Sequence, residues 1–175
     1  MDKNNGFTLI ELLVIVGVTA LILSLTLSYY NNFDSQQQLR TEARKVVDVL
    51  ELAKNKAAAG DSANFCINSF SGYEVNFTNS SYTLHPCCGM DCTKNTIVTY
   101  SIPSNTSISI LNTGCIKFLP LTAGIDTSAT TACYPYTLQL KSSILPGGPG
   151  GKNCLTIQVD NSGVIKLNDS SFGGC

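Results

Sequence analysis

Eight cysteines are the residues of this 175-residue chain whose type and number most clearly indicate chemistry. An even number of cysteines favours four disulfides in an oxidising compartment, although eight cysteines allow about 105 pairings and the sequence does not choose among them. A disulfide at the last residue would fix a terminus that otherwise frays. The disulfide candidates are Cys66, Cys87, Cys88, Cys92, Cys115, Cys133, Cys154 and Cys175.

Metal binding is the competing interpretation of some of these residues. The segment from His85 to Cys92 contains three cysteines and the single histidine, which are zinc ligands, but the usual two Cys-x-x-Cys pairs are absent and adjacent cysteines are awkward ligands. Asp160-Asn161-Ser162-Gly163 lacks the acid density of a calcium loop and is better explained as a turn. We therefore expect neither a metal nor another cofactor.

Catalysis finds little support in the sequence. No Ser-His-Asp or paired-carboxylate set can be assembled around His85, and the six acids of residues 61–175 are spread from Asp61 to Asp169. Only 13% of the residues are charged and the formal net charge is −1, which argues against a polycationic nucleic-acid binder and against a charge-driven disordered chain. We expect a protein that is not an enzyme.

Glu11 is unusual because it stands in a long apolar segment. It is the only charged residue between Lys3 and Asp34, and a helix over Phe7–Ser28 would be about 33 Å long, close to the thickness of the apolar core of a bilayer. A carboxylate inside a membrane costs about 2.5 to 3.5 kcal/mol, so such a residue usually has a partner or a function. The alternative is that Glu11 lies about one turn inside and extends its carboxylate to the interface.

The residues around Glu11 resemble the signal of a known family. Gly6-Phe7-Thr8-Leu9-Ile10-Glu11-Leu12-Leu13-Val14 resembles the class III signal of type IV prepilins and pseudopilins. The resemblance implies that a prepilin peptidase removes residues 1–6 by cleaving between Gly6 and Phe7, and that Phe7 is then N-methylated. It also implies that the Glu11 carboxylate pairs with the Phe7 amine of a neighbouring subunit during assembly, so that neither charge is buried alone.

A long helix must position these residues. Residues 7–33 form its expected transmembrane half, and residues 34–60 form an amphipathic half with an apolar stripe on one face. Ser35 followed by Gln38 has the form of a capping box, so the helix could restart there, and Gly60 is a suitable end. We expect a helix, with or without a kink, over residues 7–59. Its stripe consists of Leu39, Ala43, Val46, Val47, Leu50, Ala53 and Ala57.

Residues 61–175 predict a β-rich globular head. Asn, Ser and Thr fill 38 of these 115 positions, and short β-prone runs alternate with turn residues. Asn161-Ser162-Gly163 predicts a hairpin turn, and Pro146–Gly151 predicts a connection. The expected fold class is α+β, with a long stem helix followed by a disulfide-rich, mostly antiparallel, pilin-like head. The expected strands are 64–68, 73–78, 82–85, 96–102, 107–111, 115–119, 136–140, 155–160 and 164–167.

The second half of the helix carries a looser resemblance. Gln36–Ala43 and Val49–Ala57 are similar to the stem of the H-type pseudopilins of type II secretion and of the T- and U-type fimbrial minor pilins. The resemblance implies a structural subunit of a type IV pilus or type II secretion pseudopilus. The implied partners are other pilin or pseudopilin subunits, the prepilin peptidase, an inner-membrane assembly platform and membrane lipid. The implied location is a single pass of the inner membrane, with the head in the periplasm or outside the cell.

Two alternatives exist within the same family. Some minor pilins bind DNA for uptake through basic residues near the C-terminal strands, but this head has five lysines, six acids and no arginine. DNA affinity needs clustered cations, so a nucleic-acid partner is not expected. A pilus-tip adhesin is the other alternative, which the Asn-, Ser- and Thr-rich surface permits without favouring it.

Overall fold

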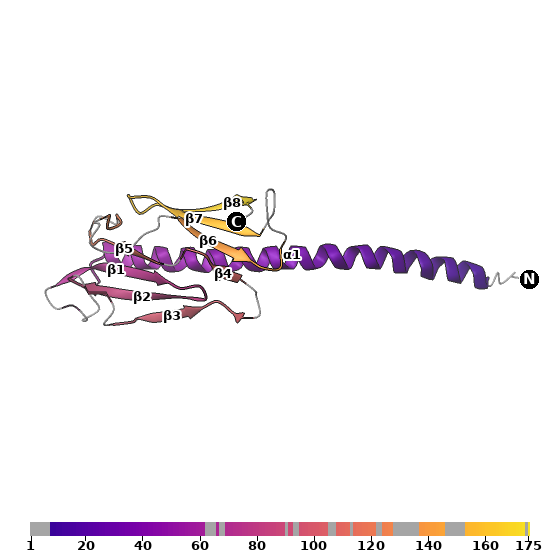
Figure 1. Cartoon of the computed structure of the whole chain (residues 1–175), viewed down its shortest axis with the longest axis horizontal. Helices are drawn as coiled ribbons and strands as arrows, with labels where there is room; N and C mark the ends of the chain where they lie inside the picture. Colours follow the sequence, from indigo (N-terminus) through magenta and orange to yellow (C-terminus); the bar gives the residue numbers. More distant parts are fainter. Residues whose placement is uncertain are drawn as a thin grey trace, which may run out of the picture. The chain divides into compact units, whose positions relative to one another are not determined.

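The computed structural model describes residues 8–61, 66, 69–89, 91–92, 95–104, 108–112, 114–121, 124–127, 137–145, 153–173 and 175, without the side chains of 25–31 and 169–173. The described residues form a long helix and two four-stranded antiparallel sheets (Figure 1). The chain divides into two compact units, residues 1–34 and 35–175. The fold class is therefore α+β, as predicted, with a pilin-like combination of a long helix, antiparallel sheets and disulfides.

Helix α1 runs from Leu9 to Ala58. It ends where the sequence predicts, because Gly60 adopts a left-handed conformation with φ of 65°. The Gly60 N–H donates to the carbonyl of Ala57 over 3.0 Å, and the N–H of the next residue, 61, donates to the carbonyl of residue 56 over 3.1 Å. These two bonds form a Schellman motif, which satisfies carbonyls that a helix end leaves unpaired.

The predicted apolar stripe of α1 is confirmed. Six of its seven positions are at most 1% exposed, and Val47 is half-buried against the core. Val49, which the predicted stripe did not include, is buried as well. Glu42 is buried beside the stripe with its carboxylate 2.7 Å from Nζ of Lys45. The helix continues through Ser35 without interruption, so the restart considered at that residue does not occur.

The strands form two sheets in which all pairs are antiparallel. The first sheet has the order β3-β2-β1-β5, and the second has the order β4-β6-β7-β8. Strand boundaries follow the alternation of buried and exposed residues, as in β6, where half-buried and buried positions alternate. The bounds are β1 Phe70–Phe77, β2 Ser81–Cys88, β3 Val98–Ser101, β4 Ile108–Ile110, β5 Gly114–Phe118, β6 Thr137–Ser142, β7 Cys154–Val159 and β8 Ile165–Gly173.

Eight of the nine predicted strands are confirmed, with shifted ends. The largest shift is in β8, which extends to Gly173 although the predicted strand ends at residue 167. The other predicted strand, residues 64–68, lies outside the described residues except for Cys66, which is not in a strand. The Pro146–Gly151 stretch also lies outside the described residues.

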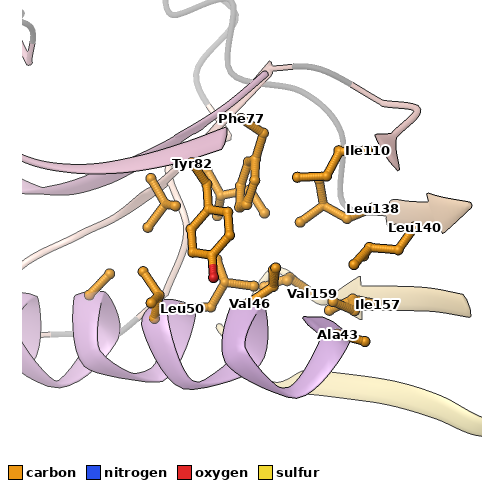
Figure 2. Packing of buried hydrophobic residues seen from close by; sticks show 14 of the residues in the cluster. Ala43, Val46, Leu50, Phe77, Tyr82, Ile110, Leu138, Leu140, Ile157 and Val159 are labelled. Atoms are coloured by element: carbon orange, nitrogen blue, oxygen red, sulfur yellow. The ribbon is translucent and has the colours of Figure 1, made fainter. Parts of the chain in front are cut away.

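The hydrophobic core of the second unit is shared by the helix and both sheets. Figure 2 shows Val46 and Leu50 of α1 facing the same interior as side chains from the two sheets. The first sheet supplies Phe77 and Tyr82 there, and both are at most 2% exposed. The residues contributed by the second sheet, also labelled in Figure 2, are Ile110, Leu138, Leu140, Ile157 and Val159.

The predicted disulfide bonding of the head is confirmed, and no described cysteine is free. Cys115 is disulfide-bonded, and Cys133 lies outside the described residues. Cys87 and Cys88 are adjacent but bond to different partners, because neighbouring residues of a strand point to opposite faces. The pairs between described cysteines are Cys66–Cys88, Cys87–Cys92 and Cys154–Cys175.

Candidate functional site

The N-terminal end of α1 carries the part of the predicted processing and assembly site that the structure describes. Thr8 is the N-cap, since its Oγ1 accepts the N–H of Glu11 over 3.3 Å and its carbonyl accepts the N–H of Leu12 over 3.2 Å. Glu11 lies in the first turn with an exposed side chain, where the partial positive charge of a helix N-terminus favours an acid. Gly6 and Phe7 lie outside the described residues.

The role of Thr8 escaped the sequence analysis, although the spacing contained the signal. Thr8-Leu9-Ile10-Glu11 has the Thr-x-x-Glu form of a capping box. The same four residues belong to the stretch that resembles a prepilin signal, so we interpreted Glu11 only as an assembly residue. The structure adds that Thr8 fixes the start of the helix that presents Glu11.

Residues 9–23 expose apolar side chains on all sides of the helix. The least exposed of the large ones is Ile15, at 47%, and the most exposed is Leu9, at 81%. The hydroxyl of Thr19 donates to the carbonyl of Ile15 over 2.9 Å, so it is satisfied within the helix. A helix that is apolar all round is stable only when other apolar groups cover it. The exposed residues are Leu9, Ile10, Leu12, Leu13, Val14, Ile15, Val16, Val18, Leu21, Ile22 and Leu23.

Membrane crossing was predicted for residues 7–33. Within the part of the chain that the structure describes, no helix is at once long enough and apolar enough to traverse a bilayer. The predicted segment includes Phe7 and the side chains of residues 25–31, which lie outside that part.

The segment from His85 to Cys92 offers no thiolate to a zinc ion, because its three cysteines are all in disulfides. The carboxylate of Glu74 lies within 4.8 Å of the sulfurs of Cys87 and Cys92, but a disulfide sulfur is not a thiolate ligand. His85 faces hydroxyl groups on both sides, with Nε2 2.7 Å from Oγ1 of Thr83 and Nδ1 3.3 Å from Oγ1 of Thr96. Among the described residues, these two threonine hydroxyls are the hydrogen-bonding groups that orient the imidazole.

The segment considered for calcium binding is a hairpin turn between β7 and β8, as the sequence predicts. Oδ1 of Asp160 accepts the Ser162 hydroxyl over 2.6 Å and the N–H groups of Ser162 and Val164, each over 3.0 Å. These hydrogen bonds, with that from the Ser162 hydroxyl the strongest, lower the pKa of Asp160. Gly163 has a φ of 77°, which suits glycine. Donors of the turn itself therefore occupy this carboxylate oxygen.

The sequence did not lead us to expect a largely buried group of charges formed by Glu74 of β1, Lys117 of β5 and Asp126, which follows β5 in the chain. Nζ of Lys117 lies 3.4 Å from Oδ2 of Asp126, and Glu74 stands opposite Lys117 in the strand register. Glu74 and Lys117 are each 6% exposed. Burial raises the pKa of Glu74, and the charge of Lys117 and a hydrogen bond with Asn76 oppose that shift more weakly. The sequence did contain a sign of this group, because each of two predicted strands has a single charged residue. Buried charges are usually paired, so two such strands are candidates for neighbours.

Comparison with known proteins gives one match. Residues 1–27 match the family described as the prokaryotic N-terminal methylation motif. No curated protein and no solved structure matches the chain. The matched residues contain the stretch 6–14 that resembles a prepilin signal, so the prediction of an N-terminal methylation motif is confirmed. The matched residues therefore stand at the start of a long helix that is followed by disulfide-bonded antiparallel sheets, an arrangement with a pilin-like fold.

Proposed function

We propose that this chain is a minor pilin or pseudopilin, a structural subunit of a type IV pilus or of a type II secretion pseudopilus. The observation that carries the proposal is the methylation motif at residues 1–27, placed at the start of a 50-residue helix. A prepilin peptidase cleaves between Gly6 and Phe7, the leader of residues 1–6 is lost, and Phe7 is N-methylated. The similarity of the second half of the helix to H-type pseudopilins and to T- and U-type minor pilins favours those subtypes.

The exposed apolar surface of residues 9–23 supports assembly into a bundle of helices. Apolar surface removed from water contributes about 25 cal/mol per Å², so a surface of this kind is strongly driven to be covered. Before assembly, lipid of the inner membrane covers it. After assembly on an inner-membrane platform, the helices of other pilin or pseudopilin subunits cover it.

Glu11 sets the register of neighbouring subunits in the proposed filament. Cleavage creates an amine at Phe7, and an amine and a carboxylate in an apolar bundle each cost several kcal/mol when alone. Pairing the Glu11 carboxylate with the Phe7 amine of the next subunit offsets both costs. Thr8 supports this role, because its hydroxyl caps the helix and so places Glu11 within the first turn.

The disulfides of residues 61–175 support a head outside the cytoplasm. Disulfides persist in oxidising compartments such as the periplasm and the cell surface and are rare in the cytosol. No described cysteine of this chain is free. The head therefore suits a single-pass protein with residues 1–6 inside and residues 61–175 outside the inner membrane.

Processing and assembly can be tested separately in the native host. We expect Gly6→Ala to leave the leader attached, and Glu11→Ala to permit cleavage but to lower incorporation into filaments. N-terminal mass spectrometry reads the first effect, and the ratio of the chain in sheared filaments to that in membranes reads the second. Glu51→Ala is a matched control, because it removes an acid from the same helix outside the apolar segment and should leave both readouts unchanged. Native material that retains residues 1–6, or normal incorporation of Glu11→Ala, would contradict the proposal.

A further inference from the structure

A groove of about 240 Å³ lies between α1 and the first sheet. On the helix side it is lined by Lys45, Asp48, Val49 and Leu52. These positions recur at intervals of three and four residues, so their side chains lie on one face of α1. The sheet side is formed by Tyr82 of β2 and Tyr100 of β3, whose rings stack with centroids 5.2 Å apart. Because β3 is the last strand of its sheet, the groove lies next to a sheet edge. This tyrosine groove is lined by Lys45, Asp48, Val49, Leu52, Tyr82 and Tyr100.

The first unusual feature of the tyrosine groove is the hydroxyl of Tyr82. The Tyr82 side chain is 2% exposed, and Figure 2 shows its oxygen directed towards α1. The hydroxyl oxygen is not fully enclosed, and no hydrogen bond to it is found among the described residues. Burial, together with the negative charges of Glu42 and Asp48 and the neighbouring Tyr100, raises the pKa of Tyr82 to about 12. A neutral phenol oxygen that faces a groove and lacks a partner is able to accept a hydrogen bond from a ligand.

The second unusual feature is the charge of Asp48. The neighbouring acids of the helix are paired, with Glu42 2.7 Å from Nζ of Lys45 and Glu51 3.8 Å from Nζ of Lys54. Asp48 is exposed and has no ion-pair partner in the described part of the chain. The groove is thus lined by two charged side chains, of which Lys45 is paired with Glu42 and Asp48 has its carboxylate available to a ligand cation.

We propose that the tyrosine groove binds a lysine or arginine side chain presented by a partner protein. The aliphatic part of such a side chain fits the wall of Val49, Leu52 and the two tyrosine rings, as long cationic side chains cover apolar surface and stack on aromatic rings. Its cationic end has only donors, which match the Asp48 carboxylate and the Tyr82 oxygen.

Other side chains complement the groove less well. A glutamate would repel Asp48, and an aliphatic side chain would cover the Tyr82 hydroxyl without providing a hydrogen bond. The position beside β3 allows a partner strand or loop to approach the sheet edge while it inserts one side chain. This interaction does not depend on the proposed filament function, because all the residues involved lie within residues 35–175.

The test uses the full chain in detergent micelles with its tyrosine rings isotopically labelled for NMR. The probes are three tripeptides, acetylated and amidated at their ends, with the sequences Gly-Lys-Gly, Gly-norleucine-Gly and Gly-Glu-Gly. We expect the lysine peptide to shift the ring signals of Tyr82 and Tyr100 in a saturable way. The other two peptides should bind more weakly, by up to about fivefold, the upper ratio expected for one exposed ion pair.

Two variants localise the interaction. Asp48→Asn should weaken binding of the lysine peptide by up to about fivefold, whereas Glu51→Gln, which removes an acid outside the groove, should leave it unchanged. An unchanged backbone spectrum of Asp48→Asn shows that the fold is intact. The proposal is overturned if the lysine peptide shifts neither ring, if the norleucine peptide binds equally well, or if Asp48→Asn binds as the parent does.

Discussion

The hydroxyl of Tyr73 donates a hydrogen bond to the backbone carbonyl of Asp61 over 2.5 Å, and this bond joins β1 to the turn that follows α1. The carboxylate of Asp61 also binds Nζ of Lys56 at 2.7 Å, and that nitrogen lies 5.9 Å from the centre of the Tyr73 ring. The hydrogen bond to Asp61 is the main cause of a raised pKa of Lys56. These three residues hold the junction between helix and head.

Tyr73→Phe should lower the free energy of unfolding by about 1 kcal/mol, the net value of one hydrogen bond, because it keeps the buried ring and removes only the hydroxyl. The measurement is urea unfolding of the full chain in detergent, followed by near-ultraviolet circular dichroism. Tyr100→Phe is the matched control, since its hydroxyl has no hydrogen bond among the described residues. Equal losses in both variants would show that the bond to Asp61 does not stabilise the junction.

Gly72→Ala should destabilise the head strongly. Gly72 lies in β1 with a φ of +130°, and an added Cβ would collide with the carbonyl oxygen of Phe118. A side chain in such a conformation costs about 1 to 3 kcal/mol before the collision is counted. Gly89→Ala separates the two effects, because Gly89 also has a positive φ, of +65°, but open space around it. Unfolding midpoints should therefore fall further for Gly72→Ala than for Gly89→Ala, and the reverse order would refute this account.

Removal of individual disulfides should have effects that follow the length of the closed loop. Cys154 and Cys175 are 21 residues apart in sequence, whereas Cys87 and Cys92 are 5 apart. In the chain-entropy description, replacing both members by alanine costs about 3 kcal/mol for the longer loop and about 2 kcal/mol for the shorter. Denaturant unfolding of the two double variants checks this order, which equal or inverted losses would contradict.

The buried carboxyl of Glu74 predicts a pH dependence of stability. Burial raises its pKa in the folded state above the ordinary 4.5, so the folded state binds more protons than the unfolded state just above that pH. The favourable contribution of Glu74 to the free energy of unfolding is complete below pH 4.5. It is lost as the pH rises through the pKa of Glu74 in the folded state. Glu74→Gln should therefore gain stability relative to the parent chain as the pH rises.

The control for this measurement is Asp160→Asn, for which the expected change of stability with pH has the opposite sign. The pKa of Asp160 is lowered from 3.8, so its contribution exists above that pH and disappears as the pH falls. Any advantage of the parent over Asp160→Asn should shrink on acidification. Unfolding curves recorded over a pH series test both variants, and a stability difference for Glu74→Gln that does not change with pH would refute the prediction.

Local patterns predicted most of the secondary structure. The stripe from Leu39 to Ala57 repeats with helical spacing, and its residues are buried in the structure because a helix can cover a core only along one face. The end at Gly60 was readable because a glycine can adopt the left-handed conformation that a Schellman motif requires. The restart that the capping box made possible at Ser35 does not occur, because the polar residues there are compatible with a continuous helix.

Contacts between segments that are distant in the sequence could not be predicted from local patterns. The sheet orders, the pairing of Glu74 with Lys117 across two strands and the meeting of Asp48 with Tyr82 depend on which strands become neighbours. The cysteine pairs depend on the same arrangement, since Cys66 and Cys88 meet only once β1 and β2 have paired. In the candidate site, Glu11 was predicted from a motif that is contiguous in the sequence. This prediction therefore did not require knowledge of the fold.

The two adjacent disulfides at the end of β2 tie its last two residues to different parts of the head. Cys87 and Cys88 point to opposite faces of their strand, so exchanging their partners would require β2 to slip by one residue against β1. That slip would turn Leu84, which is fully buried, out of the core. The native pair of disulfides is therefore compatible only with the register that keeps Leu84 in the core.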